Sequence, residues 1–166
     1  MTEPFQIRPM LPEDWPEVLR IYESGMATGD ATFEQEAPGW EQWNASHGEA
    51  CRLIAVREGG IAGWAALSPV SKRKVYRGVA EVSIYLDQPF RGKGWACRLL
   101  SELVRLSEQE GFWTLQASIF PENGASIRVH ERCGFRVVGR REKIGKMDGC
   151  WRDTILMERR SPLDFL

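Results

Sequence analysis

The chain has 166 residues, 43% of them hydrophobic, and its 22 basic and 23 acidic side chains leave a net charge of −1. This length is typical of one domain with a substantial core, and the balanced charge gives no overall attraction to nucleic acid or to an anionic membrane. No segment approaches the roughly 18 consecutive apolar residues of a membrane-spanning helix, and the N-terminal MTEPFQIRPM lacks a signal-peptide core. We therefore expect a cytoplasmic protein with a single domain over residues 1–160, followed by a loose tail over residues 161–166.

The cysteines and histidines do not predict a metal site. The four cysteines are widely spaced without a C-x-x-C pair, and the chain has only two histidines. A structural zinc site needs four closely grouped ligands of these types. We therefore expect reduced, mostly packed cysteines and no bound metal.

The N-terminal quarter predicts a short strand and two helices. Residues 5–8 alternate apolar and polar side chains, as a half-buried strand does. A helix is expected to begin near Asp14, because Asp14-Trp15-Pro16-Glu17 has the spacing of a capping box and a proline in the first turn. A glycine-rich loop follows over residues 25–39, and a second helix is predicted over Trp40–Ser46.

A β-hairpin is predicted next. Two short apolar runs, residues 53–56 and 61–67, flank the pair Gly59-Gly60. A Gly-Gly pair between two such runs is a hairpin signal, because glycine readily adopts the positive φ angles of tight turns.

Residues 81–106 predict a strand, a turn and a helix. The strand EVSIYLDQPF is rich in β-branched and aromatic side chains, and the segment after Ala96 repeats leucine at helical spacing. The turn between them, Arg91-Gly92-Lys93-Gly94-Trp95-Ala96, has two glycines and two cations. Glycines let the backbone approach a ligand, and the N–H groups at a helix start attract anions. The pattern therefore predicts a phosphate site.

Two other phosphate-binding motifs do not fit this turn. A Walker loop needs G-x-x-x-x-G-K-[ST], and a dinucleotide fold needs G-x-G-x-x-G after its first strand; neither pattern is present. The alternative to a phosphate site is an ordinary strand-to-helix connection with solvent-exposed charges. The spacing R-x-x-G-x-A resembles the pyrophosphate loop of the GNAT superfamily of acyl-CoA-dependent N-acetyltransferases.

Residues 114–120 alternate apolar and polar side chains up to Pro121 and predict another strand. A helix and two further strands are predicted after it. The helix is expected from Asn123 to about Cys133, with Gly134 as its stop. Another strand is predicted to begin over Phe135 to Val138, and the last strand is predicted over residues 150–157. This order of elements predicts an α/β (α+β) domain with helices on both faces of one sheet.

A second motif strengthens the resemblance. GNAT enzymes often carry N-x-x-[AS]-x-x-x-[YH]-x-x-x-G-[FY] after the strand that follows the pyrophosphate loop, and this chain matches it with Asn123, Ser126, His130, Gly134 and Phe135. The finer pattern resembles the phosphinothricin, methionine sulfoximine and arsinothricin N-acetyltransferases. The matching pieces are Ile21-Tyr22, residues 31–34, 78–85, 91–94 and 120–123, and Trp151-Arg152-Asp153.

The resemblance implies a GNAT-like, mixed, mostly antiparallel splayed sheet and acetyl-CoA as cosubstrate. The strand ending at Leu86 should part from the one starting near Thr114, and the pantetheine arm should pair with the strand backbone in that gap. Asn123 should bond the pantetheine amides, although by itself it would be interpreted as a helix cap. The implied cofactor-binding residues are Ile84, Tyr85, Leu86, Arg91, Gly92, Lys93, Gly94, Trp95, Ala96, Cys97 and Asn123.

Two residues are expected to carry the chemistry. Glu81 shares a strand face with Ser83 and Tyr85, and the matching glutamate of phosphinothricin acetyltransferases is assigned as general base, directly or through water. The alternative is a glutamate paired with a cation. His130 stands where many GNAT enzymes have a tyrosine near the leaving thiolate, and it could donate a proton or be structural. Some relatives have a histidine before Gly-x-Trp near the C-terminus, where this chain has Asp148, so that base is excluded.

The substrate contacts are expected on two loops. Lys72, Arg73, Lys74 and Arg77 precede the central strand, and guanidinium groups bind oxyanions in bidentate fashion. Arg73 is the first candidate and Arg77 the second, although a charge run is often only a solvated loop. Phe33 and Glu34 are expected to form the opposite wall.

The chain is therefore predicted to be an N-acetyltransferase acting on the α-amine of a small amino-acid-like acid. Phosphinothricin, methionine sulfoximine and arsinothricin lead the candidates, which would make it a detoxification or resistance activity. Acetylation of a peptide or protein N-terminus and non-catalytic binding of acyl-CoA are the alternatives. Nucleic acid and membranes are not expected partners, and the resemblance implies a homodimer.

Overall fold

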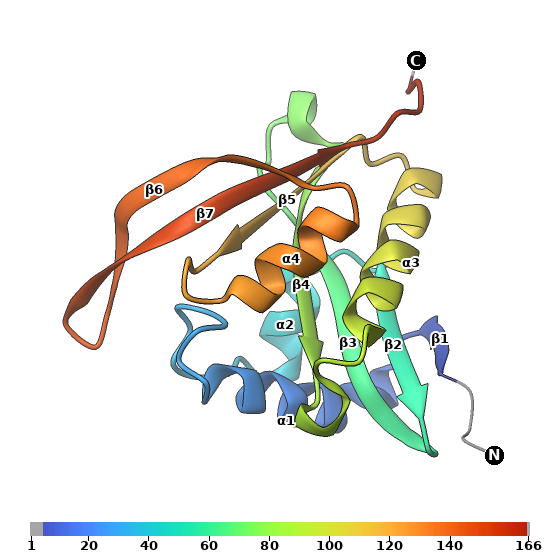
Figure 1. Ribbon diagram of the computed structural model, residues 1–166. Helices are drawn as coiled ribbons and strands as arrows, with labels where there is room; N and C mark the ends of the chain where they lie inside the picture. Colours follow the sequence, from blue (N-terminus) through green and yellow to red (C-terminus); the bar gives the residue numbers. More distant parts are fainter. Residues whose placement is uncertain (1–4, 166) are drawn as a thin grey trace.

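The computed structural model describes residues 5–165, in which seven strands form one sheet in the order β1-β2-β3-β4-β5-β7-β6 (Figure 1). The strands are β1 (Gln6–Pro9), β2 (Arg52–Arg57), β3 (Gly60–Pro69), β4 (Val79–Leu86), β5 (Thr114–Ile119), β6 (Arg136–Met147) and β7 (Cys150–Arg160). The helices are α1 (Trp15–Met26), α2 (Trp40–Ser46), α3 (Trp95–Gln109) and α4 (Gly124–Arg132), with 3-10 turns η1 (Pro12–Asp14), η2 (Lys74–Tyr76) and η3 (Gln88–Phe90). The predicted mixed, mostly antiparallel fold is confirmed.

Helices cover both faces of the sheet. The leucines of α3 are buried against alternate residues of the central strands, and α4 packs beside α3 on the same face. On the opposite face, α1 and α2 bury Ile21, Tyr22 and Trp43 against Trp64 of β3. The central strands are therefore buried on both faces of the sheet. This packing holds the strands that carry the site residues described below.

The sheet splays open between β4 and β5. These two strands are its parallel pair, and their register covers only Val79 to Glu81 of β4 against Thr114 to Gln116 of β5. Beyond Glu81, β4 continues to Leu86 and β5 to Ile119 without pairing to each other. The expected gap is thus present, and Glu81 is the last paired residue before it.

The β6–β7 hairpin is longer than the sequence pattern predicts. The strand expected to begin over Phe135–Val138 runs from Arg136 to Met147, and β7 runs past the expected Met157 to Arg160. The hairpin projects beyond the helical layers (Figure 1), and β6 is an edge strand.

Asp14 does not cap α1 as the capping-box spacing suggests. Its carboxylate accepts two hydrogen bonds from the Arg8 guanidinium, at 2.7 and 2.8 Å, and one from the Leu11 N–H at 2.8 Å. The carboxylate therefore joins β1 to the turn before the helix, because a facing guanidinium offers stronger, charged hydrogen bonds.

The tail begins with an anchored residue. Ser161 is buried, its N–H donates to the Trp113 carbonyl, and its hydroxyl donates to Glu108. Residues 162–164 after it are exposed. Residues 1–4 of the expected domain and residue 166 of the expected tail lie outside the described residues.

Two expectations about the whole chain can be compared with the structure. The cysteines form no disulfide: Cys51 is buried, Cys97 and Cys133 are half-buried, and Cys150 is exposed. None of the helices within residues 5–165 has the length and apolar character needed to cross a membrane.

Candidate active site

A cavity of about 820 Å³ occupies the gap between β4 and β5. Its walls come from the loop after α1, from β4 and β5, from the turn before α3, from α4 and from β6. Of the predicted site residues, the cavity is lined by Phe33, Glu34, Glu81, Ile84, Tyr85, Leu86, Arg91, Gly92, Ala96, Asn123 and His130. Arg73, Arg77, Lys93, Gly94, Trp95 and Cys97 lie outside this lining.

Glu81 stands at the point where the two strands separate. Its side chain is half-buried, and its Oε2 accepts a hydrogen bond from Nε2 of Gln116, the residue paired with it on β5, at 3.2 Å. No cation within the described residues forms an ion pair with Glu81, in contrast to the alternative of a cation-paired glutamate. The carboxylate is held by a neutral amide and keeps oxygen lone pairs free to accept a proton.

His130 lies beneath the cavity and is 2% exposed. Its Nδ1 is 2.7 Å from the Ser126 carbonyl oxygen. A carbonyl only accepts, so Nδ1 carries the proton and Nε2 presents a lone pair. Nε2 has no hydrogen-bond partner among residues 5–165. Burial lowers the pKa of His130 despite the bond to Ser126, which keeps the ring neutral and makes Nε2 an acceptor.

The turn before α3 has the conformation that its glycines predict. Gly92 and Gly94 have φ angles of +74° and +81°, and Gly94 is the residue that precedes the helix. A Cβ built on either glycine meets no atom within 4 Å, so open space faces both. The Arg91 side chain folds back, and its Nε donates to the Leu86 carbonyl at 3.0 Å. Trp95 instead packs inward, with its ring stacked on Phe5 at 4.6 Å.

The backbone of β4 alternates between its two neighbours. The Asp87 N–H donates to the Ala62 carbonyl of the β3 strand. Because backbone groups alternate in direction along a strand, those of Tyr85 also face β3, whereas those of Ile84 and Leu86 face the gap. The backbone groups of Ile84 and the N–H of Leu86 therefore face the cavity without a neighbouring strand, whereas the Leu86 carbonyl already accepts from Arg91. Tyr85 contributes its side chain.

Asn123 joins two parts of the site. Its Oδ1 accepts from the Ser126 N–H at 3.2 Å and caps α4, as the cap interpretation predicted. Its Nδ2 donates to the Asp30 carbonyl at 3.2 Å, so the same side chain also holds the loop after α1.

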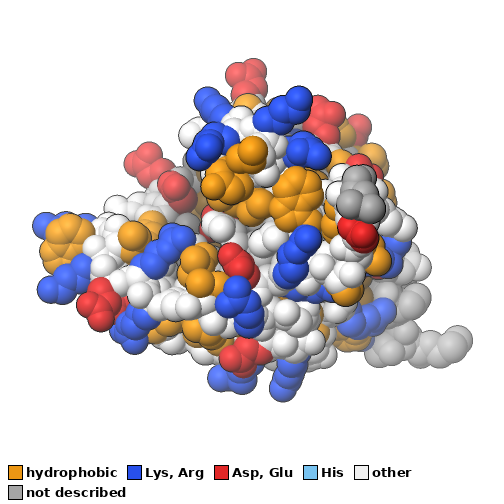
Figure 2. Space-filling model, turned by 90° about the horizontal axis from the view of Figure 1, so that it is seen from above, with side chains coloured by type: hydrophobic (Ala, Val, Ile, Leu, Met, Phe, Trp, Pro, Cys, Tyr) orange, Lys and Arg blue, Asp and Glu red, His pale blue; other side chains and the backbone are white. Residues whose placement is uncertain are grey.

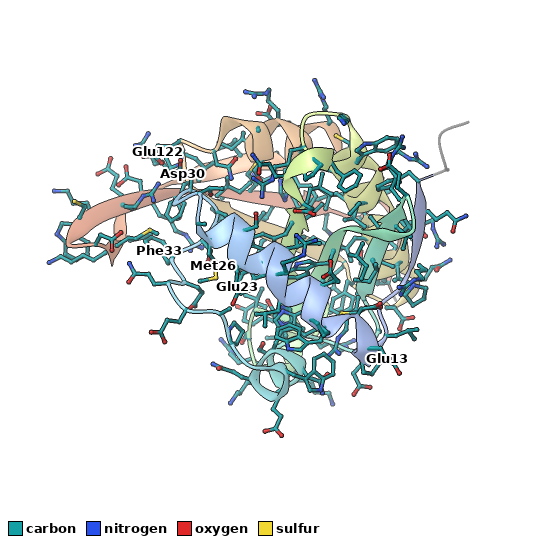
Figure 3. All side chains as sticks on the ribbon, turned by 90° about the horizontal axis from the view of Figure 1, so that it is seen from below. Glu13, Glu23, Met26, Asp30, Phe33 and Glu122 are labelled. Atoms are coloured by element: carbon teal, nitrogen blue, oxygen red, sulfur yellow. The ribbon has the colours of Figure 1, made fainter. Side chains whose placement is uncertain are left out.

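Arg152 of β7 fastens that loop from the other side. Its guanidinium donates to the Gly29 carbonyl, to Asp30 at 2.8 Å and to Glu122 at 3.3 Å, and it stacks 3.7 Å from the centre of the Phe120 ring. Figure 3 shows Asp30 and Glu122 next to each other where the loop meets the hairpin. The loop is thus fixed by bonds to β7 and α4.

Phe33 and Glu34 both line the cavity. The Phe33 ring packs edge-on against Phe120 at 4.8 Å. It also covers Gly145 of β6, where an added Cβ would lie 2.9 Å from the ring. The absence of a side chain at Gly145 therefore permits the Phe33 ring to approach β6 closely. Glu34, the next residue, is exposed at the rim of the cavity.

The two arginines expected to bind substrate lie on the surface. The Arg73 guanidinium sits over the Tyr76 ring at 5.4 Å, and that of Arg77 over the Trp113 ring at 5.2 Å. The cationic side chains that line the cavity among the described residues are Arg91 and Arg141.

Sequence reasoning missed three residues around the cavity. Gln116 was within a predicted strand, but its pairing with Glu81 depends on strand order. Arg152 was noted only as part of a matching tripeptide. Thr154 is buried, lines the cavity and has an Oγ1 without a hydrogen-bond partner in residues 5–165. No local pattern marks these residues, because the partners of Gln116 and Arg152 are distant in the sequence and Thr154 reaches the cavity only in the folded sheet.

These features suit the cosubstrate that the motifs imply. A pantetheine arm needs an unpaired strand edge, which the gap side of β4 supplies beyond Glu81. A pyrophosphate needs space beside the backbone N–H groups at a helix start, and the space around Gly92 and Gly94 before α3 is open. Among the described residues, no group of three or more histidine, cysteine or acidic side chains could hold a metal ion.

Comparisons with known proteins agree with this geometry. The model of the acetyltransferase (GNAT) family matches residues 12–135. A phosphinothricin N-acetyltransferase of Alcaligenes faecalis is 30% identical over 92% of this chain and 81% of its own. An L-methionine sulfoximine/L-methionine sulfone acetyltransferase of Pseudomonas aeruginosa is 27% identical over 87% of this chain and 88% of its own. The crystal structure of a Sinorhizobium meliloti phosphinothricin acetyltransferase with acetyl-CoA is 31% identical, with a TM-score of 0.85 over 94% of this chain and 88% of that one.

Proposed function

This chain belongs to the acetyltransferase (GNAT) family, which uses acetyl-CoA to acetylate amines, and we propose that its acceptor is the α-amine of a small amino-acid-like acid. The observation that carries the proposal is the position of Glu81, at the last paired residue before β4 and β5 separate. Relatives named for phosphinothricin and methionine sulfoximine support this class of acceptor, and we extend it to arsinothricin. The activity would be a cytoplasmic detoxification.

The proposed mechanism begins with the acceptor. An ammonium group has no lone pair, so it must lose a proton before it can attack a carbonyl carbon. Glu81 accepts this proton, directly or through one water, and Gln116 holds the carboxylate in place by its hydrogen bond to Oε2. Bound acetyl-CoA supplies the acetyl group as a reactive thioester.

His130 is assigned a positioning role in this mechanism. A proton donor to the leaving sulfur would need a proton on Nε2, and the bond from Nδ1 to the Ser126 carbonyl leaves Nε2 with a lone pair. The buried environment opposes a second proton on the ring. Nε2 would therefore accept a hydrogen bond at the floor of the cleft.

The cofactor-binding residues are proposed from the same geometry. Backbone N–H groups from Gly92 to Cys97 would hold the pyrophosphate, with Arg91 and Lys93 supplying positive charge nearby. Backbone groups of Ile84 and Leu86 would pair with the pantetheine arm. Asn123 would bond a pantetheine amide with Nδ2, the atom that now donates to the Asp30 carbonyl.

We also propose a homodimer. The β6–β7 hairpin and the η2 turn expose large apolar side chains, which are Val75, Tyr76, Val137, Val138, Ile144 and Trp151. From above, hydrophobic side chains are gathered among lysine and arginine side chains (Figure 2). Exposed apolar surface of this kind favours association. In such a dimer Arg73, which lies outside the cavity of its own subunit, would serve the acidic group of a substrate bound to the partner subunit.

The experiment for the proposed function measures free thiol released from acetyl-CoA. The acceptors are phosphinothricin, methionine sulfoximine, methionine sulfone, arsinothricin and a short peptide with a free N-terminus. We expect saturable turnover with at least one amino-acid analogue. We expect no turnover when the amine of that analogue is blocked by both an N-methyl and an N-acetyl group. Turnover of the peptide alone would replace the proposal by N-terminal acetylation, and tight binding of acetyl-CoA without turnover of any acceptor would identify a binding module.

A further inference from the structure

Two cysteines that are distant in the sequence meet where α3 packs beside α4 (Figure 1). Cys97 lies in the first turn of α3, and Cys133 is the residue directly after α4. The Cys133 Sγ is 3.6 Å from the Cys97 carbonyl oxygen and 3.6 Å from the Ser101 Oγ. Residues four apart share one face of a helix, so Cys133 rests on the face of α3 that carries both Cys97 and Ser101.

The thiol groups of Cys97 and Cys133 are also close to each other. Burial is the largest cause of a raised pKa at Cys133, and the Cys97 thiol raises that pKa further, while the Ser101 hydroxyl acts in the opposite direction. One side chain changes the pKa of another in this way only at short range, roughly 4–6 Å or less. The two sulfurs therefore face each other across the contact between the helices.

This pair differs from the other two cysteines in what can reach it. Cys97 and Cys133 are half-buried and the neighbouring Ser101 is exposed, so a small solute has access to both sulfurs. Cys51 is 1% exposed, and burial raises the pKa of its thiol to about 11. Cys150 is exposed at the start of β7.

We propose that Cys97 and Cys133 form a redox-modification site, at which a peroxide joins the two thiols in a disulfide between α3 and α4 and thereby weakens CoA binding. In the first step one sulfur attacks hydrogen peroxide, the O–O bond breaks, and a sulfenic acid and one water are formed. In the second step the other sulfur attacks the sulfenic acid and displaces a second water. Two thiols and one hydrogen peroxide thus give one disulfide and two waters; the sulfurs are oxidised and the peroxide oxygens are reduced.

The order of the two steps follows from the surroundings of the sulfurs. The thiolate is the form of cysteine that reacts with an oxidant. The raised pKa of Cys133 keeps its thiol protonated at neutral pH, where its S–H can donate to the Cys97 carbonyl. Cys133 is therefore assigned as the thiol that reacts second.

The effect on CoA follows from the position of Cys97. The first turn of α3 carries the backbone N–H groups that we propose for the pyrophosphate, and this part of the inference rests on that proposal. A disulfide needs the two sulfurs about 2 Å apart and the two Cβ atoms about 3.8 Å apart. The Cys133 sulfur now rests on the Cys97 carbonyl, so bond formation must draw the first turn of α3 towards the end of α4. Hydrogen bonds from the N–H groups of that turn would then lose their best geometry.

The first experiment maps the disulfide. Cys150→Ser is the background, because an exposed cysteine could link two chains. After treatment with hydrogen peroxide, peptide mapping without reductant should show one peptide pair that joins residues 97 and 133, with the loss of two free thiols. Dithiothreitol should restore both thiols. An oxidised protein without this peptide pair would overturn the proposal, whatever its affinity for CoA.

The second experiment measures CoA affinity by calorimetry before and after oxidation. The dissociation constant should rise about three- to tenfold, the effect of losing one hydrogen bond, and reduction should restore it. A protein that is cross-linked between residues 97 and 133 but keeps its CoA affinity would overturn the proposed control of cofactor binding.

Cys133→Ser in the same background is the matched control. Its hydroxyl can still bond the Cys97 carbonyl and Ser101, but it cannot form a disulfide. Peroxide should leave the CoA affinity of this variant unchanged. An equal loss of affinity in the variant would assign the effect to another residue and overturn the proposal. The acetyltransferase activity is measured only with reduced protein, so its failure would be separate from failure of the redox site.

Discussion

Two carboxylates show how the surroundings of a single residue determine its role. Glu81 accepts one hydrogen bond from the neutral Gln116 amide beside the main cavity. Asp14 is 9% exposed and accepts three hydrogen bonds, two of them from the Arg8 guanidinium. The first carboxylate retains free acceptor positions next to space for a ligand, whereas the second is used fully in holding β1 to α1.

Glu81→Gln should lower kcat at neutral pH by about 10²–10⁴-fold, because the amide keeps the size of the side chain but cannot accept a proton. Affinity for CoA, measured by calorimetry, should stay that of the wild type. The loss in kcat should shrink at high pH, where more of the acceptor amine is already neutral. Wild-type kcat across the pH range would show that Glu81 is structural.

Asp14→Asn should lower the free energy of unfolding by about 1–3 kcal/mol at neutral pH, through the loss of charged hydrogen bonds. The Arg8 guanidinium holds the pKa of Asp14 below its ordinary value. The stabilisation is therefore complete above the unfolded pKa of about 4 and is lost as the pH falls through the folded pKa. Urea unfolding of both proteins should show a difference at pH 7 that closes in acid; a difference independent of pH would contradict the ion pair as its source.

At the scale of elements, the turn before α3 and the loop after α1 are shaped in different ways. The turn follows from its own residues, since Gly92 and Gly94 adopt positive φ angles. The loop 27–39 is shaped by contacts from Arg152 and Asn123, which belong to β7 and to the start of α4. The conformation of the turn is therefore set by its own glycines, whereas that of the loop depends on residues that the folded sheet brings next to it.

Gly94→Ala should weaken CoA binding by at least about tenfold, because the new Cβ occupies space next to the proposed pyrophosphate site and strains its hydrogen bonds. Gly59→Ala is the matched control. Gly59 lies in the β2–β3 turn with a φ of +72° and equally open space around its Cβ. Both variants should lose about 1–2 kcal/mol of stability from the left-handed backbone. Equal CoA affinities in the two variants would remove the pyrophosphate site from this turn.

At the scale of the whole molecule, the β6–β7 hairpin is the feature on which the proposed dimer depends. β6 is an edge strand, the hairpin projects from the body, and Ile144 lies both at the surface and on the wall of the main cavity. A second subunit placed on this hairpin would cover apolar surface and border the cavity at the same time.

Trp151→Glu should shift the protein from dimer to monomer in sedimentation analysis, because a charge would be buried in the proposed interface. Leu11→Glu is the control, since Leu11 is 53% exposed and Trp151 is 55% exposed, but Leu11 lies next to α1. If the wild type sediments as a monomer at all concentrations, the proposed dimer is wrong.

Local sequence patterns by themselves were enough to predict much of the secondary structure of this protein. The hairpin of β2 and β3, the helix over Trp40–Ser46 and the strand–turn–helix around Arg91 were predicted from residues within a few positions of one another. Side-chain periodicity and glycine conformation are local properties, so they can be read without knowledge of the fold. Gly92 was predicted in the same way, whereas Glu81 was selected through the resemblance to the phosphinothricin acetyltransferases; both residues line the cavity.

The length of β6 and the contacts between residues distant in the sequence were decided only by the tertiary structure. Residues 139–147 are mostly exposed and lack an apolar alternation, and they form a strand only because β7 supplies their hydrogen bonds. Asp14 had the spacing of a helix cap, but Arg8 faces it in the folded chain. Gln116 meets Glu81, Arg152 meets Asp30, and the indole of Trp43 meets that of Trp64. These pairs are 21 to 122 residues apart, and no local pattern records which distant groups a sheet brings into contact.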